Sequence, residues 1–134
     1  MLRLIIAGSR TFADYELLQH SLDEFIALHS LGDPHPGVII ISGMAQGADQ
    51  LGLRYATERG YAVEEFPADW SKGRSAGPQR NRAMAQSANA CIAFWDGKSK
   101  GTASMIALAK RQQLKLQVIY YGDEQASPTT HSKR

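Results

Sequence analysis

The sequence predicts a single α/β domain, built on a mainly parallel, doubly wound sheet of five strands with helices on both faces. Two observations lead to this fold class. Five short apolar runs alternate along the chain with segments of helical period. The runs also contain few polar residues, which is typical of strands that helices cover on both sides. A chain of 134 residues has room for one such domain. We place it at 1–122 and expect 123–134 to be a flexible polar tail.

The first half of the chain contains two strands and two helices. Residues 2–7 are apolar except for Arg3, and this run ends at a glycine. A helical period then begins at Asp14 and ends at the turn-forming segment 32–37. The second strand covers 38–41, and the helix after it ends near Gly60. The apolar face of the first helix contains Leu18, Leu22, Phe25 and Ile26.

The second half repeats this alternation. A third strand at 61–66 leads into a polar, basic loop at 67–77. Pro78 suits the first turn of the next helix, which we expect to run to about residue 87. The remaining elements are a strand at 90–95, a helix at 102–113 and a strand at 116–121. Right-handed crossovers between parallel strands then favour a Rossmann-like order, which reverses between the first and fourth strands.

The composition is that of an ordinary globular protein. Hydrophobic residues make up 43% and charged residues 21% of the chain. No apolar run approaches the roughly 20 residues that cross a bilayer, so we expect no membrane association and a cytoplasmic location. The single cysteine, Cys91, lies in an apolar run and suits a reducing compartment as a core residue. A net charge of +2 does not by itself indicate nucleic-acid binding.

Basic residues concentrate in the segments that follow strands. In a doubly wound sheet, ligands bind beyond the carboxyl ends of the strands, close to the point where strand order reverses. An anionic ligand is the simplest explanation for cations at that edge. Seven of the fifteen basic residues lie there, namely Arg10, Lys72, Arg74, Arg80, Arg82, Lys98 and Lys100.

The turn after the first strand is the first candidate site. Gly8 allows close approach of a ligand to the backbone, and Ser9 offers a hydroxyl group. Arg10 can form a charge-assisted pair with a phosphate. The alternative is an ordinary turn with an exposed arginine.

The second candidate site is the loop after the second strand. Small residues allow a tight turn that exposes backbone N–H groups at a helix N-terminus. The loop resembles the dinucleotide fingerprint but has alanine at two of the required glycine positions, so NAD is not implied. Asp49 is a candidate for holding a ribose hydroxyl, although an acidic residue is favourable in any first helical turn. The candidates are Ser42, Gly43, Ala45, Gly47 and Asp49.

The third candidate site joins the end of the third strand to the following helix. Asp69 and Trp70 leave the strand where a base could stack or form hydrogen bonds. Arg80 and Asn81 lie on the helix that follows. In the alternative reading, Trp70 covers the core and the arginines are solvated.

The loop after the fourth strand is the last candidate. It contains Gly-Lys-Ser, but the leading glycine of a P-loop would fall at Ile92. The loop still ends in a small residue and a threonine at a helix N-terminus, which can bind phosphate. Its candidates are Asp96, Gly97, Gly101 and Thr102. The four histidines are scattered, so neither a metal site nor a nucleophilic triad is predicted, and no cofactor is implied.

Taken in order, these motifs resemble the YspA/YpsA-related branch of the SLOG superfamily. The resemblance spans nearly the whole domain. It implies a Rossmann-like fold, nucleotide-related binding and a homodimer. It is carried by the Gly8-Ser9-Arg10 turn, Ser42-Gly43-x-Ala45-x-Gly47-Ala48-Asp49, Ala68-Asp69-Trp70, Gly77-Pro78-x-Arg80-Asn81-x-x-Met84, Ala93-Phe94-Trp95-Asp96-Gly97 and Gly101-Thr102.

Two groups of relatives imply different activities. LOG phosphoribohydrolases cleave an N-glycosidic bond with an arginine, matched here by Arg80, and with a glutamate, whose position here is Met105. Cleavage would then need a relocated carboxylate, for which Asp49, Asp69 and Asp96 are the candidates. DprA is similar in its Ser-Gly loop and in Arg80-Asn81-Arg82, which implies single-stranded DNA binding.

The sequence therefore favours a domain that binds a nucleotide or nucleotide-derived ligand, such as a sensor. The phosphates are expected against the N–H groups of the glycine-bearing loops, beside Arg10 and Arg80. An N-glycosidic hydrolase is the alternative enzyme. Single-stranded DNA binding is the third option and is not favoured, because a domain of charge +2 binds DNA weakly.

Overall fold

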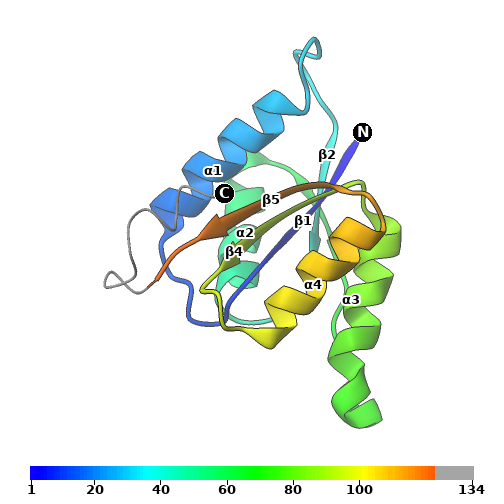
Figure 1. The fold of residues 1–134 in the computed structure, drawn as a ribbon. Coiled ribbons are helices and arrows are strands. Elements are labelled where there is room, and N and C mark those ends of the chain that lie inside the picture. Colours follow the sequence, from blue (N-terminus) through cyan, green and yellow to red (C-terminus); the bar gives the residue numbers. More distant parts are fainter. Residues whose placement is uncertain (123–134) are drawn as a thin grey trace.

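Five parallel strands form the centre of the computed structural model, which describes residues 1–122. Their order across the sheet is β3-β2-β1-β4-β5. The order thus reverses between β1 and β4, as predicted, and the doubly wound Rossmann-like fold is confirmed (Figure 1). The predicted tail at 123–134 lies outside the described residues. The strands are β1 (Leu2–Gly8), β2 (Val38–Ser42), β3 (Ala62–Glu65), β4 (Ala90–Trp95) and β5 (Lys115–Tyr120).

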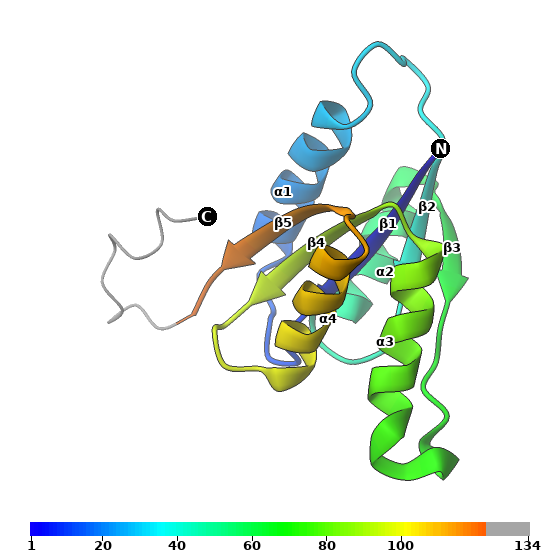
Figure 2. The same ribbon diagram turned by 45° about the vertical axis from the view of Figure 1, so that its right-hand side comes forward.

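Helices cover both faces of this sheet, as Figures 1 and 2 show. Side chains alternate along β1, so Leu4 and Ile6 pack in one core and Ile5 and Ala7 in the other. The first core contains residues of α1 and α2, and the second contains residues of α3 and α4, with buried Cys91. The helices are α1 (Tyr15–Leu28), α2 (Ala48–Arg59), α3 (Ala76–Ser87) and α4 (Lys100–Arg111).

Local signals explain where the first two helices begin and end. The Asp14 side chain caps α1 by accepting a hydrogen bond from the Leu17 amide at 3.0 Å. Gly60 ends α2 in the left-handed conformation, as predicted. All four residues of the predicted apolar face of α1 are buried. Helical period and capping residues therefore located both elements from sequence.

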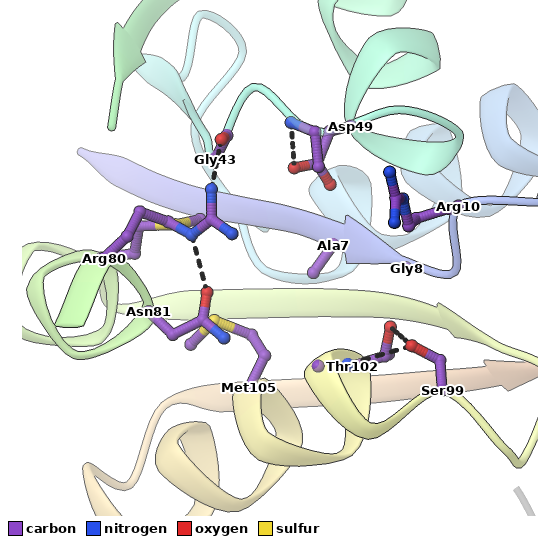
Figure 3. Close-up of a pocket in the computed structure, with 13 residues that line it drawn as sticks. Ala7, Gly8, Arg10, Gly43, Asp49, Arg80, Asn81, Ser99, Thr102 and Met105 are labelled. Carbon is purple, nitrogen blue, oxygen red and sulfur yellow. Dashed lines mark hydrogen bonds between the residues drawn. The ribbon is translucent and has the colours of Figure 1, made fainter. Parts of the chain in front are cut away.

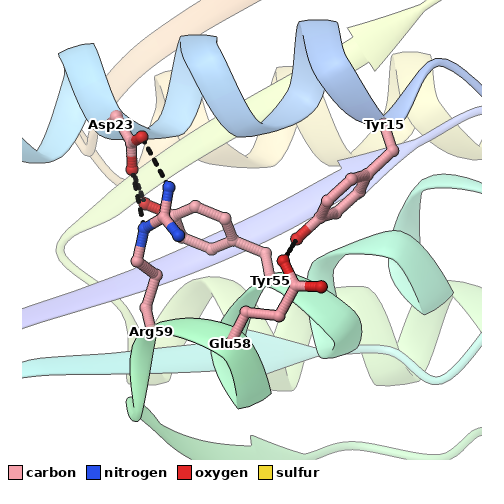
Figure 4. Close-up of polar contacts among 5 residues, drawn as sticks. All are labelled: Tyr15, Asp23, Tyr55, Glu58 and Arg59. Atoms are coloured by element: carbon pink, nitrogen blue, oxygen red, sulfur yellow. Dashed lines mark hydrogen bonds and ion pairs between the residues drawn. The ribbon is translucent and has the colours of Figure 1, made fainter.

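A polar network joins α1 to α2 on the outside of the first core (Figure 4). Tyr55 is fully buried, and its hydroxyl donates to Asp23 at 2.6 Å. Arg59 donates two further hydrogen bonds to the same carboxylate, at 2.7 and 3.2 Å. The Tyr15 hydroxyl donates to Glu58 at 2.6 Å. We call these five residues the α1–α2 clasp.

The segment between β3 and α3 differs from the sequence prediction. Residues 67–77 were expected to form a loop, but Trp70–Ser75 form η1, a 3₁₀ segment that is kinked at Gly73, and α3 begins at Ala76 rather than at Pro78. Asp69 initiates η1 because its carboxylate accepts hydrogen bonds from Ser71. Pro78 still lies in the first turn of α3, where a missing N–H group costs nothing. This segment extends beyond the rest of the domain (Figure 2).

The edge strands are less covered than the apolar runs suggested. In β3, three of four residues are exposed, including Val63. An edge strand has a neighbour on one side, and here the helices lie over the central strands. The predicted burial on both faces therefore holds for β1, β2 and β4 but not for the edge strands β3 and β5.

Candidate functional site

A pocket opens at the carboxyl edge of the sheet, beside the point where strand order reverses (Figure 3). The pocket has a volume of about 180 Å³ and is partly open to solvent. Four segments contribute to it: the end of β1, the loop between β2 and α2, one side of α3 and the start of α4. The lining residues are Ala7, Gly8, Arg10, Gly43, Ala45, Asp49, Arg80, Asn81, Met84, Ser99, Gly101, Thr102 and Met105.

The turn after β1 is held close to its neighbours. A side chain at Gly8 would come within 2.6 Å of Ala48 and of the Phe94 carbonyl, so only glycine fits there. Ser9 is buried and points away from the pocket lining, where its hydroxyl accepts a hydrogen bond from the Asp96 amide at 3.3 Å. Arg10 is exposed at the pocket rim. Of this motif, the structure brings Gly8 and Arg10 to the pocket.

The loop between β2 and α2 already uses several of its amides. The Met44 amide donates to the Ser42 hydroxyl at 3.1 Å, and the Ala45 amide donates to Asp49 at 3.0 Å. The Ala48 amide donates to the Ser9 carbonyl at 3.4 Å. This loop therefore offers a phosphate fewer free N–H groups than its glycine content suggested.

Gly47 fixes the path of this loop. Its φ of +76° and ψ of −125° are accessible to glycine but costly for other residues. A side chain at this position would also collide with the carbonyl oxygens of Ser9 and Arg10. Gly47 thus lets two of the predicted loops touch, although it does not itself line the pocket.

Asp49 is a buried acid in the pocket wall, with 7% of its surface exposed. Burial raises the pKa of its carboxyl group to about 6, although the Ala45 amide and the positive charge of Arg80 act in the opposite direction. Half of a population of such groups would be protonated near pH 6. This carboxylate is therefore poised to exchange a proton close to physiological pH.

The α3 wall carries a cation and an apolar surface. The Arg80 guanidinium donates to the Gly43 carbonyl and, at 3.0 Å, to the Asn81 side chain (Figure 3). The bond to Gly43 holds the β2–α2 loop against α3, whereas the bond to Asn81 orients the guanidinium within α3. Met84 is buried one turn further along. The wall therefore combines a fixed positive charge with a thioether.

The start of α4 forms the opposite wall. Ser99 caps this helix by accepting a hydrogen bond from the Thr102 amide at 3.4 Å, and the two hydroxyls lie 3.1 Å apart. Helix α4 therefore begins at Lys100, two residues earlier than predicted. Met105 is buried in the pocket, so this wall presents a thioether where LOG enzymes would present a carboxylate.

Asp96 shapes the loop before α4 but does not line the pocket. Its carboxylate accepts hydrogen bonds from the Lys98 and Ser99 amides at 2.8 and 2.9 Å. Partial burial acts to raise the pKa of Asp96, but these amide bonds outweigh it and lower the pKa. Gly97 provides the positive φ of the turn. Both residues support the site from outside.

Asp69 and Trp70 also lie outside the pocket lining. The Ser71 hydroxyl and amide donate to Asp69 and lower the pKa of its carboxyl group. Trp70 is 67% exposed in η1, so it neither covers the core nor faces the pocket. This third predicted site is thus divided, with Arg80 and Asn81 in the pocket and the other two residues on the surface.

Comparison with known proteins identifies the family. The family model described as the YspA, cpYpsA-related SLOG family matches residues 2–73, which is more than half of the chain. The chain belongs to this SLOG family. The match includes the β1 turn and the β2–α2 loop, whereas the α3 and α4 walls lie beyond it. No curated protein matches this SLOG chain.

A solved structure has the same fold as this SLOG domain. It is DNA processing protein A from Helicobacter pylori, whose structure was described for its single-stranded DNA binding mode. The TM-score is 0.64 and the sequence identity 20%, and the match covers 96% of this chain and 70% of that chain.

The SLOG domain thus collects nine of the predicted binding residues in one pocket. Ser42, Ser9, Gly47, Asp96 and Gly97 stabilise its loops instead. The sequence placed Met105 at the position of the LOG glutamate, and Met105 does line the pocket, but the predicted binding residues did not include Ala7, Met84 or Ser99. A serine directly before a helix is a preferred N-cap, and this signal could have located Ser99.

No helix in residues 1–122 combines the length and apolar character needed to cross a bilayer. No group of three His, Cys, Asp or Glu side chains in this part of the chain is arranged to hold a metal ion.

Proposed function

We propose that the pocket binds a nucleotide or a nucleotide-derived anion. The observation that carries this proposal is the convergence of Arg10, Asp49 and Arg80 on one pocket at the switch point of the sheet. Two cations and one acid give the lining a formal charge of +1, or +2 when Asp49 is protonated. A pocket of this charge favours an anionic ligand.

The two ends of the pocket suit the two ends of a nucleotide (Figure 3). At one end lie Arg10 and the start of α4 with Ser99 and Thr102, where a helix dipole favours phosphate. At the other end lie Met105 of α4 and Asn81 of α3. Thioethers pack well against aromatic rings, and an amide can form hydrogen bonds with a base edge.

Calorimetry against nucleoside mono-, di- and triphosphates, cyclic nucleotides and ADP-ribose tests this proposal. We expect at least one of these ligands to bind more tightly than 1 mM, which corresponds to about 4 kcal/mol. The proposal fails if none of them does.

Arg10→Ala probes the phosphate end. We expect its affinity for the same ligand to fall about tenfold, because a charge-assisted hydrogen bond contributes roughly 1.5 kcal/mol. Thermal stability should be unchanged, since Arg10 is exposed. The matched control is Arg82→Ala, which removes an exposed arginine from α3 outside the pocket. An equal loss in both variants would point to general charge attraction instead.

Cleavage of the ligand is the second candidate function. It is favoured by Asp49, because of the three carboxylates offered by the sequence it is the one that lines the pocket. A carboxyl group with a pKa of about 6 can donate or accept a proton during N-glycosidic hydrolysis. Chromatographic detection of free base from nucleoside monophosphates, lost in Arg80→Ala, would support this activity. Absence of free base across the panel would eliminate it.

Single-stranded DNA binding is the third candidate, and a separate surface favours it. Trp70 is exposed on the projecting η1, and Lys72 and Arg74 follow it. Residues 70–87 contain no acidic side chain. An exposed indole beside cations suits base stacking and phosphate contacts, and the Helicobacter pylori protein is described as binding single-stranded DNA.

Oligonucleotide binding should then weaken steeply with salt and fall in Trp70→Ala. A shallow salt dependence would count against DNA binding. The homodimer and the cytoplasmic location stay predictions from the sequence, and light scattering would measure the first.

A further inference from the structure

One oxygen of the Asp49 carboxylate has no partner in residues 1–122. Its Oδ2 accepts the Ala45 amide at 3.0 Å, whereas Oδ1 takes part in no hydrogen bond within the described part of the chain. The residue is 7% exposed, and what remains exposed faces the pocket (Figure 3). The carboxylate thus combines near-complete burial with a free acceptor on the ligand side.

The groups around Asp49 do not satisfy this oxygen. Arg80 of α3 contributes a favourable charge but forms no ion pair with Asp49 among the described residues, because its guanidinium is engaged by Gly43 and Asn81. Cys91 of β4 is buried, and burial together with the charge of Asp49 raises the pKa of its thiol to about 12. The thiol is therefore neutral. Arg10 lies at the rim. No side-chain nitrogen or oxygen atom that is fully buried among the described residues lacks a partner, so this oxygen is reached by solvent from the pocket. A ligand that displaces this solvent would need a hydrogen-bond donor there, because the oxygen would otherwise be left unpaired.

The position of Asp49 restricts what that donor can be. Asp49 lies across the pocket from Met105, with Arg10 on one side and Arg80 on the other (Figure 3). In a nucleotide that places its phosphate at Arg10 and its base at the methionine end, the sugar passes in front of this wall. A phosphate oxygen would be repelled by the carboxylate, whereas a sugar hydroxyl can donate to it.

We propose that Asp49 accepts a hydrogen bond from one of the ribose hydroxyls, so that the pocket discriminates against the deoxynucleotide that lacks this hydroxyl. This inference rests on the proposed nucleotide binding and deepens it by naming the sugar. A site built to bind a hydroxyl discriminates strongly against an analogue that lacks it, because the buried acceptor is then left without a partner. If the hydroxyl is the 2′ one, the same selectivity would exclude DNA from this pocket, so that any DNA binding would take place on the η1 surface.

A structural role for Asp49 has a different signature. If the carboxylate serves only to hold the Ala45 amide, the Asp49→Asn variant keeps that bond through its Oδ1 atom and should bind both sugars as the native protein does. Asp69→Asn is the matched control, since it makes the same chemical change to a carboxylate outside the pocket.

Calorimetry with the four ribonucleoside 5′-monophosphates and their 2′- and 3′-deoxy counterparts tests the inference. For the base that binds best, we expect the native protein and Asp69→Asn to prefer the ribonucleotide at least tenfold over one deoxy form at pH 7.5. In Asp49→Asn the preference should fall below threefold. In the native protein it should also diminish at pH 5, because protonation removes the carboxylate acceptor.

The outcomes separate the two proposals. Equal binding of the ribonucleotide and both deoxy forms by the native protein overturns the role of Asp49 and leaves nucleotide binding intact. A preference that persists in Asp49→Asn also overturns it. The proposed function itself is wrong if none of these monophosphates binds and if none of the di- and triphosphates, cyclic nucleotides or ADP-ribose binds either.

Discussion

The α1–α2 clasp and the pocket each contain an aspartate carboxylate, but the two carboxylates differ in their hydrogen-bond partners. In the clasp, Asp23 accepts hydrogen bonds from Tyr55 and Arg59, and the Arg59 bonds are the main cause of its lowered pKa (Figure 4). In the pocket, Asp49 has one amide donor, and burial raises its pKa. The clasp therefore stabilises the ionised acid, whereas the pocket destabilises it.

This difference suggests how structural and functional polar groups can be told apart in one domain. A group whose partners all come from the chain contributes to folding. A mostly buried acid whose free oxygen faces a pocket lowers stability when it ionises, and natural sequences retain such groups where a ligand supplies a partner. Substitutions in the two regions should then change the free energy of unfolding by different amounts and, for the two aspartates, in opposite directions.

The largest effect is expected at Gly47, which joins the loops of the pocket. Gly47→Ala should lower the free energy of unfolding by about 3 kcal/mol, from an unfavourable φ/ψ pair and a collision with the Ser9 and Arg10 carbonyls. The matched control is Gly73→Ala, because Gly73 has a similar φ of 72° and ψ of −143° but open space around it. It should lose only about 1 to 2 kcal/mol. Equal losses of unfolding free energy in Gly47→Ala and Gly73→Ala, measured by urea titration, would show that the chain around Gly47 moves to relieve the collision.

The next effect compares one substitution in both regions. Asp49→Asn should raise the free energy of unfolding at pH 7.5 by about 1 to 3 kcal/mol, since the native carboxylate must ionise while buried. The pKa is raised from 3.8 to about 6, so the penalty is absent below pH 3.8 and complete above pH 6. The increase in the free energy of unfolding of Asp49→Asn should therefore vanish near pH 3.5.

Asp23→Asn should have the opposite effect on the free energy of unfolding over the same pH range. The pKa of Asp23 is lowered, so its ionised form stabilises the fold above its unfolded pKa of 3.8, and this contribution is lost as the pH falls. The variant should be less stable than the native protein at pH 7.5. Destabilisation by both substitutions would contradict the distinction between the two regions.

The smallest effect is expected from Tyr55→Phe in the clasp. This change removes the buried hydroxyl that donates to Asp23 but leaves the Arg59 bonds in place. We expect a loss of about 1 kcal/mol in chemical denaturation. Nucleotide affinity should not change, because Tyr55 does not line the pocket. Altered affinity would show that the clasp and the pocket are coupled.

The sequence by itself determined the fold and the edge of the sheet at which the site lies. Apolar runs, helical period and capping residues such as Asp14 and Gly60 act over a few neighbouring positions, so they can be read from one segment at a time. The strand order followed because right-handed crossovers leave few arrangements. Arginines and glycines after the strands then predicted where most of the pocket lining would gather.

Only the tertiary structure decided which groups face the ligand. Arg80 reaches the Gly43 carbonyl across 37 positions of sequence, and Ala48 donates to Ser9 on another loop. These contacts occupy amides that the sequence left available and bury Asp49 without a full set of partners. Trp70, predicted beside the site, is instead exposed on η1. Burial and hydrogen-bond satisfaction depend on how distant segments pack, which no local pattern records.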